Sequence, residues 1–481
     1  MNRKLVFKNL GRLISSLGVL LLLPIITAIC YREWKCLIIF TGVAVVSVAV
    51  GMLMYKCIKP KDNVLYAKEG FAITALAWVA LSLFGALPFT LSGEIPNYID
   101  ALFETVSGFT TTGASIIPDV ESMSRSLLMW RSFTHWVGGM GVLVFMLAVL
   151  PNISDRSVHI MRAEMPGPLF GKIVPRSKDT AKILYLIYIV MTIVMILFLL
   201  AGGMTLFESV VHAVGTAGTG GFGIKADSVG SYSPYIQWVI TVFMIIFGVN
   251  FNLYYYFIIK RSISAFKSTE LYVYFGIIVA SALTICTNVF SLYGNVSDAI
   301  RHSFFQVASI ISTSGFATVD FNLWPEFSKG LIFCLIFIGG CAGSTAGGLK
   351  VARIILVVKT IGAEIRRLVH PRAVSVVRFE GKTVDSESKN GVTIYIAIFA
   401  LCYAIAFLLI SLEPHGFTTN FTAVATCINN VGPGLDKVGP AGSFAIYNNF
   451  STLVLTFTML LGRLEIFPLL LTCMPGTWRR D

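Results

Sequence analysis

Ser107-Gly-Phe-Thr-Thr-Thr-Gly-Ala-Ser115 is the stretch that decides the fold, because three shorter phrases of the same kind follow it along the chain. They read Thr219-Gly-Gly-Phe222, Thr313-Ser-Gly-Phe316 and Asn429-Asn-Val-Gly-Pro-Gly434. Each contains a polar residue, one variable residue and a glycine, and these glycines lie 108, 94 and 117 residues apart. A short apolar stretch of helical character precedes each phrase. The spacing therefore predicts four repeated units of one kind.

The composition places these units in a membrane. Of 481 residues, 56% are hydrophobic and only 13% are charged, whereas a soluble domain carries about 25% charged residues. Charge-free runs long enough to cross a bilayer occupy residues 13–31, 37–55, 70–93, 132–154, 183–207, 228–259, 271–297, 330–349, 390–412 and 438–462. We therefore expect an all-α integral membrane protein with several spans, not a secreted, cytosolic or disordered one.

The basic residues indicate how the chain is oriented. Of the 37 lysines and arginines, 28 fall in a set of segments that lie on one side if each run crosses once, namely 1–12, 56–68, 155–182, 260–267, 350–389 and the C-terminal tail. Short loops rich in Lys and Arg stay in the cytoplasm, so we expect both termini to be cytoplasmic. The net charge of +12 then reflects topology, and we expect no nucleic-acid partner.

Each unit reads as a helix, a half-helix too short to span, a loop and a second helix. Such a half-helix must enter and leave on the same side, and its loop is tolerated at membrane depth only where it is buried in protein or lines water. Four such loops in one chain predict four pseudo-symmetric helix–pore-loop–helix repeats around one ion pore, after two extra N-terminal transmembrane helices. The expected boundaries are 1–64 for the two leading helices and 65–155, 156–265, 266–370 and 371–481 for the repeats.

We expect the ion path to run through the four triplets. The candidate filter residues are Thr111, Thr112, Gly113, Thr219, Gly220, Gly221, Thr313, Ser314, Gly315, Asn430, Val431 and Gly432. A row of backbone carbonyls can replace the water shell of a cation, and pointing them at one axis requires positive φ angles that glycine adopts readily. Each half-helix would also turn its negative C-terminal pole toward the axis. The alternative is ordinary helix packing by small residues.

Two further intramembrane features are candidates for a gate. The glycine-rich segment 339–348 interrupts the last apolar helix of the third unit, because glycine disfavours helix, and predicts an intramembrane loop under the filter. Arg463 lies within the last apolar helix, where a central charge costs about 2.5–3.5 kcal/mol, and Glu465 lies on a different helix face. The candidate gating residues are Gly339, Gly340, Gly343, Gly347, Gly348, Lys350 and Arg463.

Less specific interpretations of these features stay open. The glycine segment is also compatible with close helix packing, and Arg463 with a snorkelling or structurally paired side chain. In the interpretation that we favour, Arg463 is the only clear central charge and faces the pore. A stretch without Lys or Arg contains four acids and predicts an acidic outer mouth, namely Asp100, Glu104, Asp119 and Glu121. Such a mouth would raise the local concentration of cations. Ordinary solvated loop charge is the alternative.

The four phrases resemble the filter segments of the Trk/Ktr/HKT superfamily of K⁺ transporters, and the resemblance covers about residues 65–475. The leading helix pair favours the TrkH-like branch, the bacterial Trk system potassium uptake proteins. The resemblance implies K⁺ as the transported ion, bound at the filter residues only, with no organic cofactor. Gly113 favours K⁺, since relatives with serine there tend toward Na⁺. Gly220 lacks a bulky side chain, which implies modest selectivity over Na⁺.

The same resemblance implies a location and partners. We expect a homodimer in the bacterial inner membrane, surrounded by lipid, in which the loop 339–348 obstructs the pore. We also expect a cytoplasmic nucleotide-binding ring of the RCK type, TrkA-like, that docks on the basic segments 155–182 and 350–389 and controls the gate.

Two other classes of function compete with this interpretation. A gradient-coupled carrier, driven by H⁺ or Na⁺, would need inverted repeats and an ionisable pair at mid-membrane, whereas the four units run in one orientation. A membrane-embedded enzyme would need a catalytic pair or zinc cluster at membrane depth, and the sequence suggests neither. We therefore expect a transporter and not an enzyme.

Overall fold

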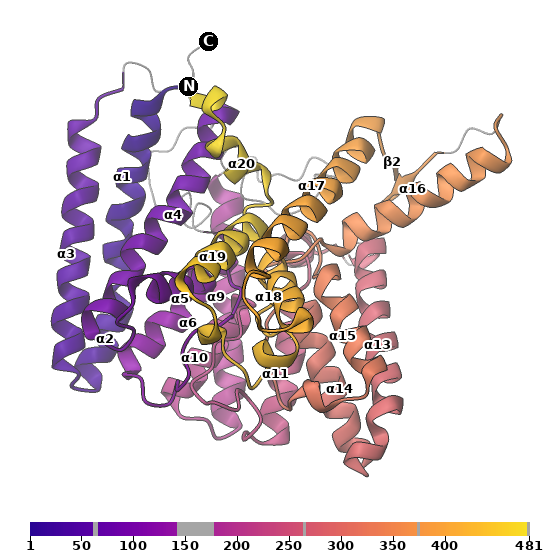
Figure 1. Cartoon of the computed structure of the whole chain (residues 1–481), viewed down its shortest axis with the longest axis horizontal. Coiled ribbons are helices and arrows are strands. Elements are labelled where there is room, and N and C mark those ends of the chain that lie inside the picture. The colour runs from indigo at the N-terminus through magenta and orange to yellow at the C-terminus, as the bar shows by residue number, and fades with distance from the viewer. Residues whose placement is uncertain (61–65, 142–177, 263–265, 373–375, 479–481) are drawn as a thin grey trace.

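The computed structural model describes residues 1–60, 66–141, 178–262, 266–372 and 376–478, and these are almost wholly helical (Figure 1). A helix pair leads the chain: α1 (Arg3–Leu20), continued by α2 (Leu22–Cys30), and α3 (Trp34–Cys57). Gly11 and Gly51 bring the two backbones together, because a Cβ on either would lie less than 3.0 Å from the carbonyl oxygen of the other. Small residues allow this close approach between helices in a membrane. The pair stands at one edge of the molecule, beside α4.

Four units follow, and each begins with a long helix and a half-helix. The long helices are α4 (Ala67–Ser92), α9 (Lys178–Ala201), α13 (Thr269–Tyr293) and α17 (Ser386–Ile410). The half-helices are α5 (Tyr98–Phe109), α10 (Leu206–Ala217), α14 (Val296–Ile311) and α18 (Phe417–Asn429). At 1.5 Å per residue, the 12 residues of α5 reach about 18 Å, well short of the roughly 30 Å hydrocarbon core. The predicted fold class is confirmed.

The second helix of every unit is short or broken. These elements are α6 (Arg125–Gly139), α11 (Pro234–Phe247) with α12 (Phe251–Lys260), α15 (Glu326–Ile338) with α16 (Val351–Val369), and α19 (Asn449–Arg463) with α20 (Phe467–Cys473). The sequence predicted a break only at 339–348. The chain also bends by 87° between α11 and α12, where the Asn250 side chain caps the second helix. It breaks again at Glu465 and Ile466, whose φ angles are 52° and 64°.

These breaks change the account of the membrane spans. Six helices of the described part are long and apolar enough to cross a bilayer, or seven if the bent α11–α12 pair counts as one span. The runs 228–259, 330–349 and 438–462 are therefore not single straight helices, and the run 132–154 lies partly outside the described residues. Broken helices are possible here because their irregular backbone packs inside the protein and not against lipid.

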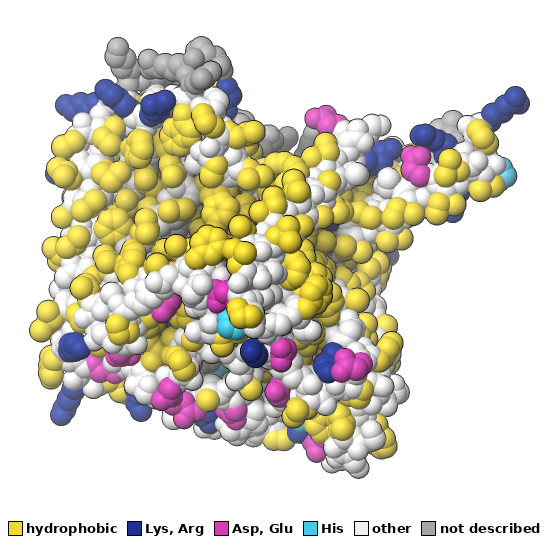
Figure 2. Space-filling model, in the orientation of Figure 1, with side chains coloured by type: hydrophobic (Ala, Val, Ile, Leu, Met, Phe, Trp, Pro, Cys, Tyr) yellow, Lys and Arg dark blue, Asp and Glu magenta, His cyan; other side chains and the backbone are white. Residues whose placement is uncertain are grey.

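The surface is consistent with a membrane setting. Hydrophobic side chains form a broad band in Figure 2, lysines and arginines gather along the upper edge, and acidic residues gather along the lower one. The two ends of the chain lie together on the upper side, since the Arg3 guanidinium donates to the Trp478 carbonyl at 3.0 Å. A small hairpin, β1 (Arg378–Phe379) paired with β2 (Lys382–Thr383), follows α16 on the same side.

Candidate functional site

The four half-helices end in the same backbone turn. In each, the N–H of the middle triplet residue donates to the carbonyl five residues earlier, at 2.8–3.0 Å, from Thr112 to Ser107, Gly220 to Gly215, Ser314 to Ser309 and Val431 to Thr426. The first triplet residues are left-handed, with φ of 56°, 54°, 57° and 53° at Thr111, Thr219, Thr313 and Asn430. The third residues, Gly113, Gly221, Gly315 and Gly432, have φ of 79°, 76°, 78° and 100°. This is a Schellman ending that continues into a second left-handed residue.

The four triplets close into one ring. A Cβ added to Gly113 would lie less than 3.0 Å from the Gly220 carbonyl oxygen of the second repeat. The same relation holds from Gly221 to Ser314, from Gly315 to Val431, and from Gly432 back to Thr112. Each glycine therefore meets the middle carbonyl of the next repeat in the order one, two, three, four, one. All twelve candidate filter residues come together around this axis, and the ring leaves no space for a side chain at the glycine positions.

Side chains of the triplets form hydrogen bonds that stabilise the ring. The Asn430 amide donates to Thr112 Oγ1 at 2.9 Å and to the Met459 carbonyl of α19 at 3.0 Å, so it joins the fourth repeat to the first. Thr112 Oγ1 also lies 2.7 Å from Thr110 Oγ1. At the first triplet position of the fourth repeat, the Asn430 amide nitrogen therefore braces the ring.

The second triplet is braced by a residue of the first repeat. Gly220 has no side chain, and the space that a Cβ would occupy is filled by the imidazole of His135 on α6. His135 Nδ1 lies 2.8 Å from the Gly108 carbonyl, and its ring is 4.1 Å from that of Phe222 between centroids. This contact could not be predicted from the sequence, because a lone histidine on a helix is usually a packing residue.

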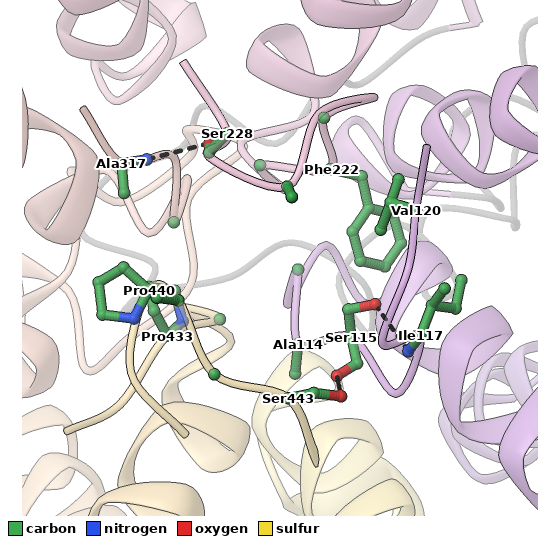
Figure 3. Close-up of a pocket in the computed structure, with 18 of the residues that line it drawn as sticks. Ala114, Ser115, Ile117, Val120, Phe222, Ser228, Ala317, Pro433, Pro440 and Ser443 are labelled. Atoms are coloured by element: carbon green, nitrogen blue, oxygen red, sulfur yellow. Dashed lines mark hydrogen bonds between the residues drawn. The ribbon is translucent and has the colours of Figure 1, made fainter. Parts of the chain in front are cut away.

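A cavity of about 180 Å³ opens at the glycine end of the ring and is lined by all four glycines (Figure 3). Its walls come from the segments that leave the triplets, among them Ala114, Ser228 and Pro433. The prediction of an acidic mouth is wrong for Glu104. That residue is 1% exposed and forms an ion pair with Arg131 on α6, because an apolar half-helix buries its carboxylate. Asp119 and Glu121 are solvent-exposed.

The glycine segment 339–348 lies against the opposite end of the ring. The Gly347 N–H donates to Thr313 Oγ1 at 2.6 Å, and the Gly348 N–H donates to the Asn429 carbonyl at 2.9 Å. Gly339, Gly343, Gly348 and Lys350 all have φ between 72° and 75°, which explains why glycine is so frequent there. Gly347 and Gly348 of the loop are therefore in direct contact with the third triplet and with the residue directly before the fourth.

Three charged side chains hold this loop. Arg463 donates to the Thr345 carbonyl at 2.9 Å and to the Gly138 and Gly139 carbonyls at 2.6 and 2.9 Å. The Lys350 ammonium donates to the Ala346 carbonyl. Glu270, in the first turn of α13, accepts from the N–H groups of Ala342 and Ala352 at 2.6 and 3.2 Å. Glu270 was not among the predicted site residues.

A second ion pair links the two helix breaks. Arg353, in the first turn of α16, pairs with Glu465 at 2.5 Å, and both groups are largely buried. The guanidinium also lies 4.0 Å from the centroid of the Tyr395 ring. The expectation that Arg463 is the only clear central charge is therefore wrong. Glu465 lies in the break after α19, so the comparison of helix faces with Arg463 does not apply, and its partner is an arginine distant in sequence.

These features define a class of protein: a multi-pass membrane protein in which four half-helices end in one ring of left-handed turns, with a loop packed against one end. Comparison with known proteins identifies the family. The family model TrkH, described as a cation transport protein, matches residues 37–477. The chain therefore belongs to the TrkH family of cation transport proteins.

Individual relatives match along their full length. The Trk system potassium uptake proteins TrkH of Salmonella typhimurium and of Escherichia coli are each 36% identical to this chain, over 98% of it and 99% of their own length. The crystal structure of the potassium transporter TrkH from Vibrio parahaemolyticus superposes with a TM-score of 0.90 at 32% identity, covering 100% of both chains. The resemblance inferred from the four phrases is confirmed.

Proposed function

We propose that this chain carries K⁺ into the cell across the bacterial inner membrane, through the ring of four triplets. The observation that carries the proposal is the closure of that ring, in which each glycine meets the middle carbonyl of the next repeat. A closed ring of such turns gives one axis lined by backbone carbonyls, which can replace the hydration shell of an alkali cation. The names of the TrkH relatives, potassium uptake proteins, support K⁺ as the ion. No organic cofactor is needed.

The loop 339–348 would act as the gate. In the structure it packs directly against Thr313 and Asn429, so an ion leaving the ring at that end would meet it. Opening would require that the bonds to Thr313, Asn429, Glu270 and Arg463 break or rearrange together. Lys350 and Arg463 place positive charge beside this end of the ring, which opposes cation passage until the loop moves. We propose that the third repeat spans residues 266–370 and the fourth spans residues 371–481, as the sequence predicts. With these boundaries, the loop belongs to the third repeat and Arg463 belongs to the fourth.

Regulation would come from the basic side of the molecule. We propose that a nucleotide-binding ring of the RCK type docks on segments 155–182 and 350–389, and that this side and both termini are cytoplasmic. Residues 142–177 lie outside the described residues, but α16 projects from the body and carries the second segment (Figure 1). Exposed apolar side chains line one face of α16 at helical spacing, namely Val358, Ile361, Ile365 and Leu368. A second copy of the chain would cover this face, which supports a homodimer.

A coupled carrier remains the competing function. The buried pair Arg353–Glu465 supplies the ionisable couple that such a carrier needs. Such a carrier is also typically built from inverted repeats. The ring does not fit that pattern, since all four half-helices contribute their C-terminal ends to it. The voltage at which net K⁺ current reverses separates the two. A passive pore reverses at the K⁺ equilibrium potential, whereas an H⁺- or Na⁺-coupled carrier shifts with the second gradient.

The direct test is cation flux into proteoliposomes that contain this chain alone, with K⁺, Rb⁺ and Na⁺ compared. Flux that favours K⁺ and Rb⁺, and loses this preference in Gly113→Ser, is the expected result, because a serine Cβ would collide with the Gly220 carbonyl. Absence of flux is resolved by adding the nucleotide-loaded ring, since a gate that its partner opens would then conduct. If no cation crosses under either condition, a conducting pore is the wrong function.

A further inference from the structure

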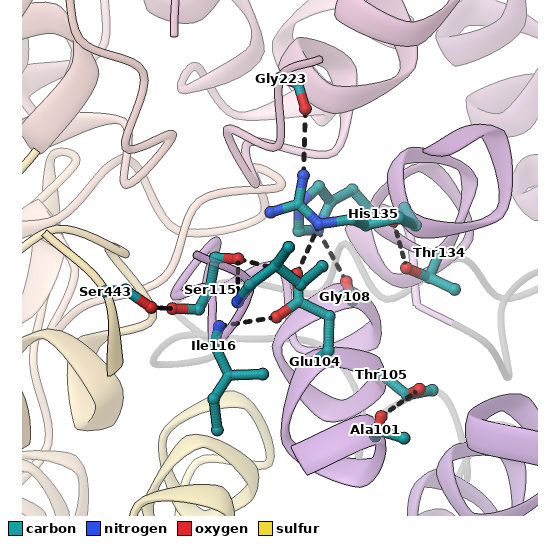
Figure 4. Close-up of polar contacts among 12 residues, drawn as sticks. Ala101, Glu104, Thr105, Gly108, Ser115, Ile116, Thr134, His135, Gly223 and Ser443 are labelled. Carbon is teal, nitrogen blue, oxygen red and sulfur yellow. Dashed lines mark hydrogen bonds and ion pairs between the residues drawn. The ribbon is translucent and has the colours of Figure 1, made fainter. Parts of the chain in front are cut away.

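An ion pair buried beside the ring supports the first repeat. Glu104 on α5 and Arg131 on α6 lie 2.5 Å apart, with 0% and 3% of their side chains exposed. The Glu104 carboxylate also accepts from the Ile116 N–H at 2.9 Å and from the Ser115 hydroxyl at 3.2 Å (Figure 4). Both donors belong to the segment that leaves the triplet directly after Gly113. The carboxylate therefore fixes the position of the chain on the outer side of the first triplet.

The arginine extends this support to the second repeat. Arg131 Nη1 donates to the Gly223 carbonyl at 3.0 Å, and the guanidinium lies 3.5 Å from the centroid of the Phe222 ring. Phe222 and Gly223 directly follow Gly221. The pair thus ties together the outgoing segments of two neighbouring repeats, across the boundary where Gly113 meets the Gly220 carbonyl.

On the outer side of the ring, the segments that leave the triplets are held together at the other three boundaries without a buried ion pair, in the ranges that the structure describes. The second and third repeats are joined by the Val229 N–H to the Ala317 carbonyl at 3.0 Å. The third and fourth are joined by Asn322 to the Asp436 backbone at 2.9 and 3.2 Å. The fourth and first are joined by the Phe444 N–H to the Ser115 carbonyl at 3.0 Å. Among the described residues on this side of the ring, a buried ion pair therefore joins only the first and second repeats.

The repeats also differ at the position of Glu104 itself, seven residues before the first triplet residue. The equivalent residues are His212, Gln306 and Ala423. Gln306 also holds the segment that leaves its own triplet, but without a charge, since its amide donates to the Val319 carbonyl at 3.1 Å. Only Glu104 carries a charge and reaches, through Arg131, into the next repeat. The second repeat is also the one whose triplet, with Gly220, has no middle side chain to hold it.

We propose that the Glu104–Arg131 pair is a positioning element that sets discrimination between K⁺ and Na⁺, by fixing the separation of the first and second repeats in the ring. The argument rests on the proposed function. In the cavity-size account of selectivity, a larger ion is favoured over a smaller one because the carbonyls are kept from closing around the smaller one. The planar guanidinium holds one carboxylate, one carbonyl and one aromatic face at fixed angles, which a lysine ammonium does not do. Arg131 also lines the outer cavity, so Glu104 neutralises a positive charge at the entrance.

Two variants separate positioning from charge. Arg131→Lys keeps both charges and loses the fork that reaches Gly223. Glu104→Gln/Arg131→Met removes both charges, which leaves the entrance neutral and the clamp absent. The matched control is Lys329→Gln, which breaks the partly exposed pair with Glu326 on α15, away from the ring. For each purified protein we would measure the K⁺/Na⁺ flux ratio in proteoliposomes and the difference in unfolding midpoint between KCl and NaCl.

The proposal expects both variants to lower the K⁺/Na⁺ ratio by roughly three- to tenfold, as loss of a charge-assisted contact would allow, and to shrink the midpoint difference. The control should match the wild type in both. A folded Arg131→Lys or double variant with the wild-type ratio would overturn the proposal, because the pair would then serve stability alone. If the variants do not fold, Phe222→Leu removes the aromatic face, retains both charges and is judged in the same way. A wild-type protein without K⁺ preference would instead contradict the proposed function.

Discussion

Arg463→Ala should raise cation flux through the chain in the absence of any partner. Among the described residues, Arg463 donates to the loop at the Thr345 carbonyl and to the end of α6 at the Gly138 and Gly139 carbonyls. The bonds to α6 join elements that need not separate when the loop moves. The bond to Thr345 joins the fourth repeat to the loop, so under the proposed gating mechanism it stabilises the closed state and is lost on opening.

The size of the effect follows from that single bond. A hydrogen bond to a charged group contributes about 1.5–3 kcal/mol, and about 1.4 kcal/mol changes an equilibrium tenfold. Removing the bond should therefore increase the ratio of open to closed protein by roughly tenfold to a hundredfold. Removing a positive charge beside the ion path acts in the same direction.

The assay is uptake of Rb⁺ into proteoliposomes, normalised to the amount of monodisperse protein recovered. Arg463→Lys is the control, because it keeps the charge but lacks the planar guanidinium whose two terminal nitrogens reach Thr345 and the end of α6 separately. If charge is the barrier, this variant stays near the wild type. If the tether matters, its flux lies between the wild type and Arg463→Ala. A folded Arg463→Ala protein with unchanged or lower flux would refute both accounts of the residue.

Three other perturbations test the ring and the loop. Gly220→Ala should lower the unfolding midpoint and the K⁺ flux, since its methyl group meets the His135 ring. Adding His135→Ala should recover part of both losses. A Gly220→Ala protein that behaves like the wild type would show that the imidazole moves aside freely. Glu270→Gln replaces a charged acceptor of the Ala342 and Ala352 N–H groups and should raise basal Rb⁺ uptake by about tenfold; unchanged uptake would mean that the loop does not depend on this contact. Replacing K⁺ by choline should lower the unfolding midpoint, because a bound ion stabilises the folded protein by about 2.7 kcal/mol when its concentration is 100 times Kd. A midpoint that is independent of K⁺ in calorimetry would argue against a K⁺ site in the closed state.

The four-repeat architecture could be predicted because one backbone turn is needed four times. A left-handed residue followed, after one intervening residue, by a left-handed glycine restricts the sequence wherever it occurs, so Gly113, Gly221, Gly315 and Gly432 stand out without a structure. The break at 339–348 was visible for the same reason. The bend between α11 and α12 was not, since a single Asn250 within an apolar run is a weak signal for a helix cap. The break after Arg463 depends on strained residues, Glu465 and Ile466, that no propensity predicts.

The charged residues were misplaced for a physical reason. A search for charge-free runs treats every charge as the end of a span, and Arg131 and Glu270 lie directly before the runs 132–154 and 271–297. A charge at the edge of a run can equally be a buried one whose partner comes from elsewhere in the chain, as Arg353 and Glu465 show at a separation of 112 residues. Repetition in the sequence therefore reveals what the four repeats have in common. What distinguishes them depends on partners distant in sequence: an ion pair between the first two repeats, a loop in the third and Arg463 in the fourth. These asymmetries are the means by which a ring with nearly equivalent walls could acquire selectivity at one boundary and a gate at one end.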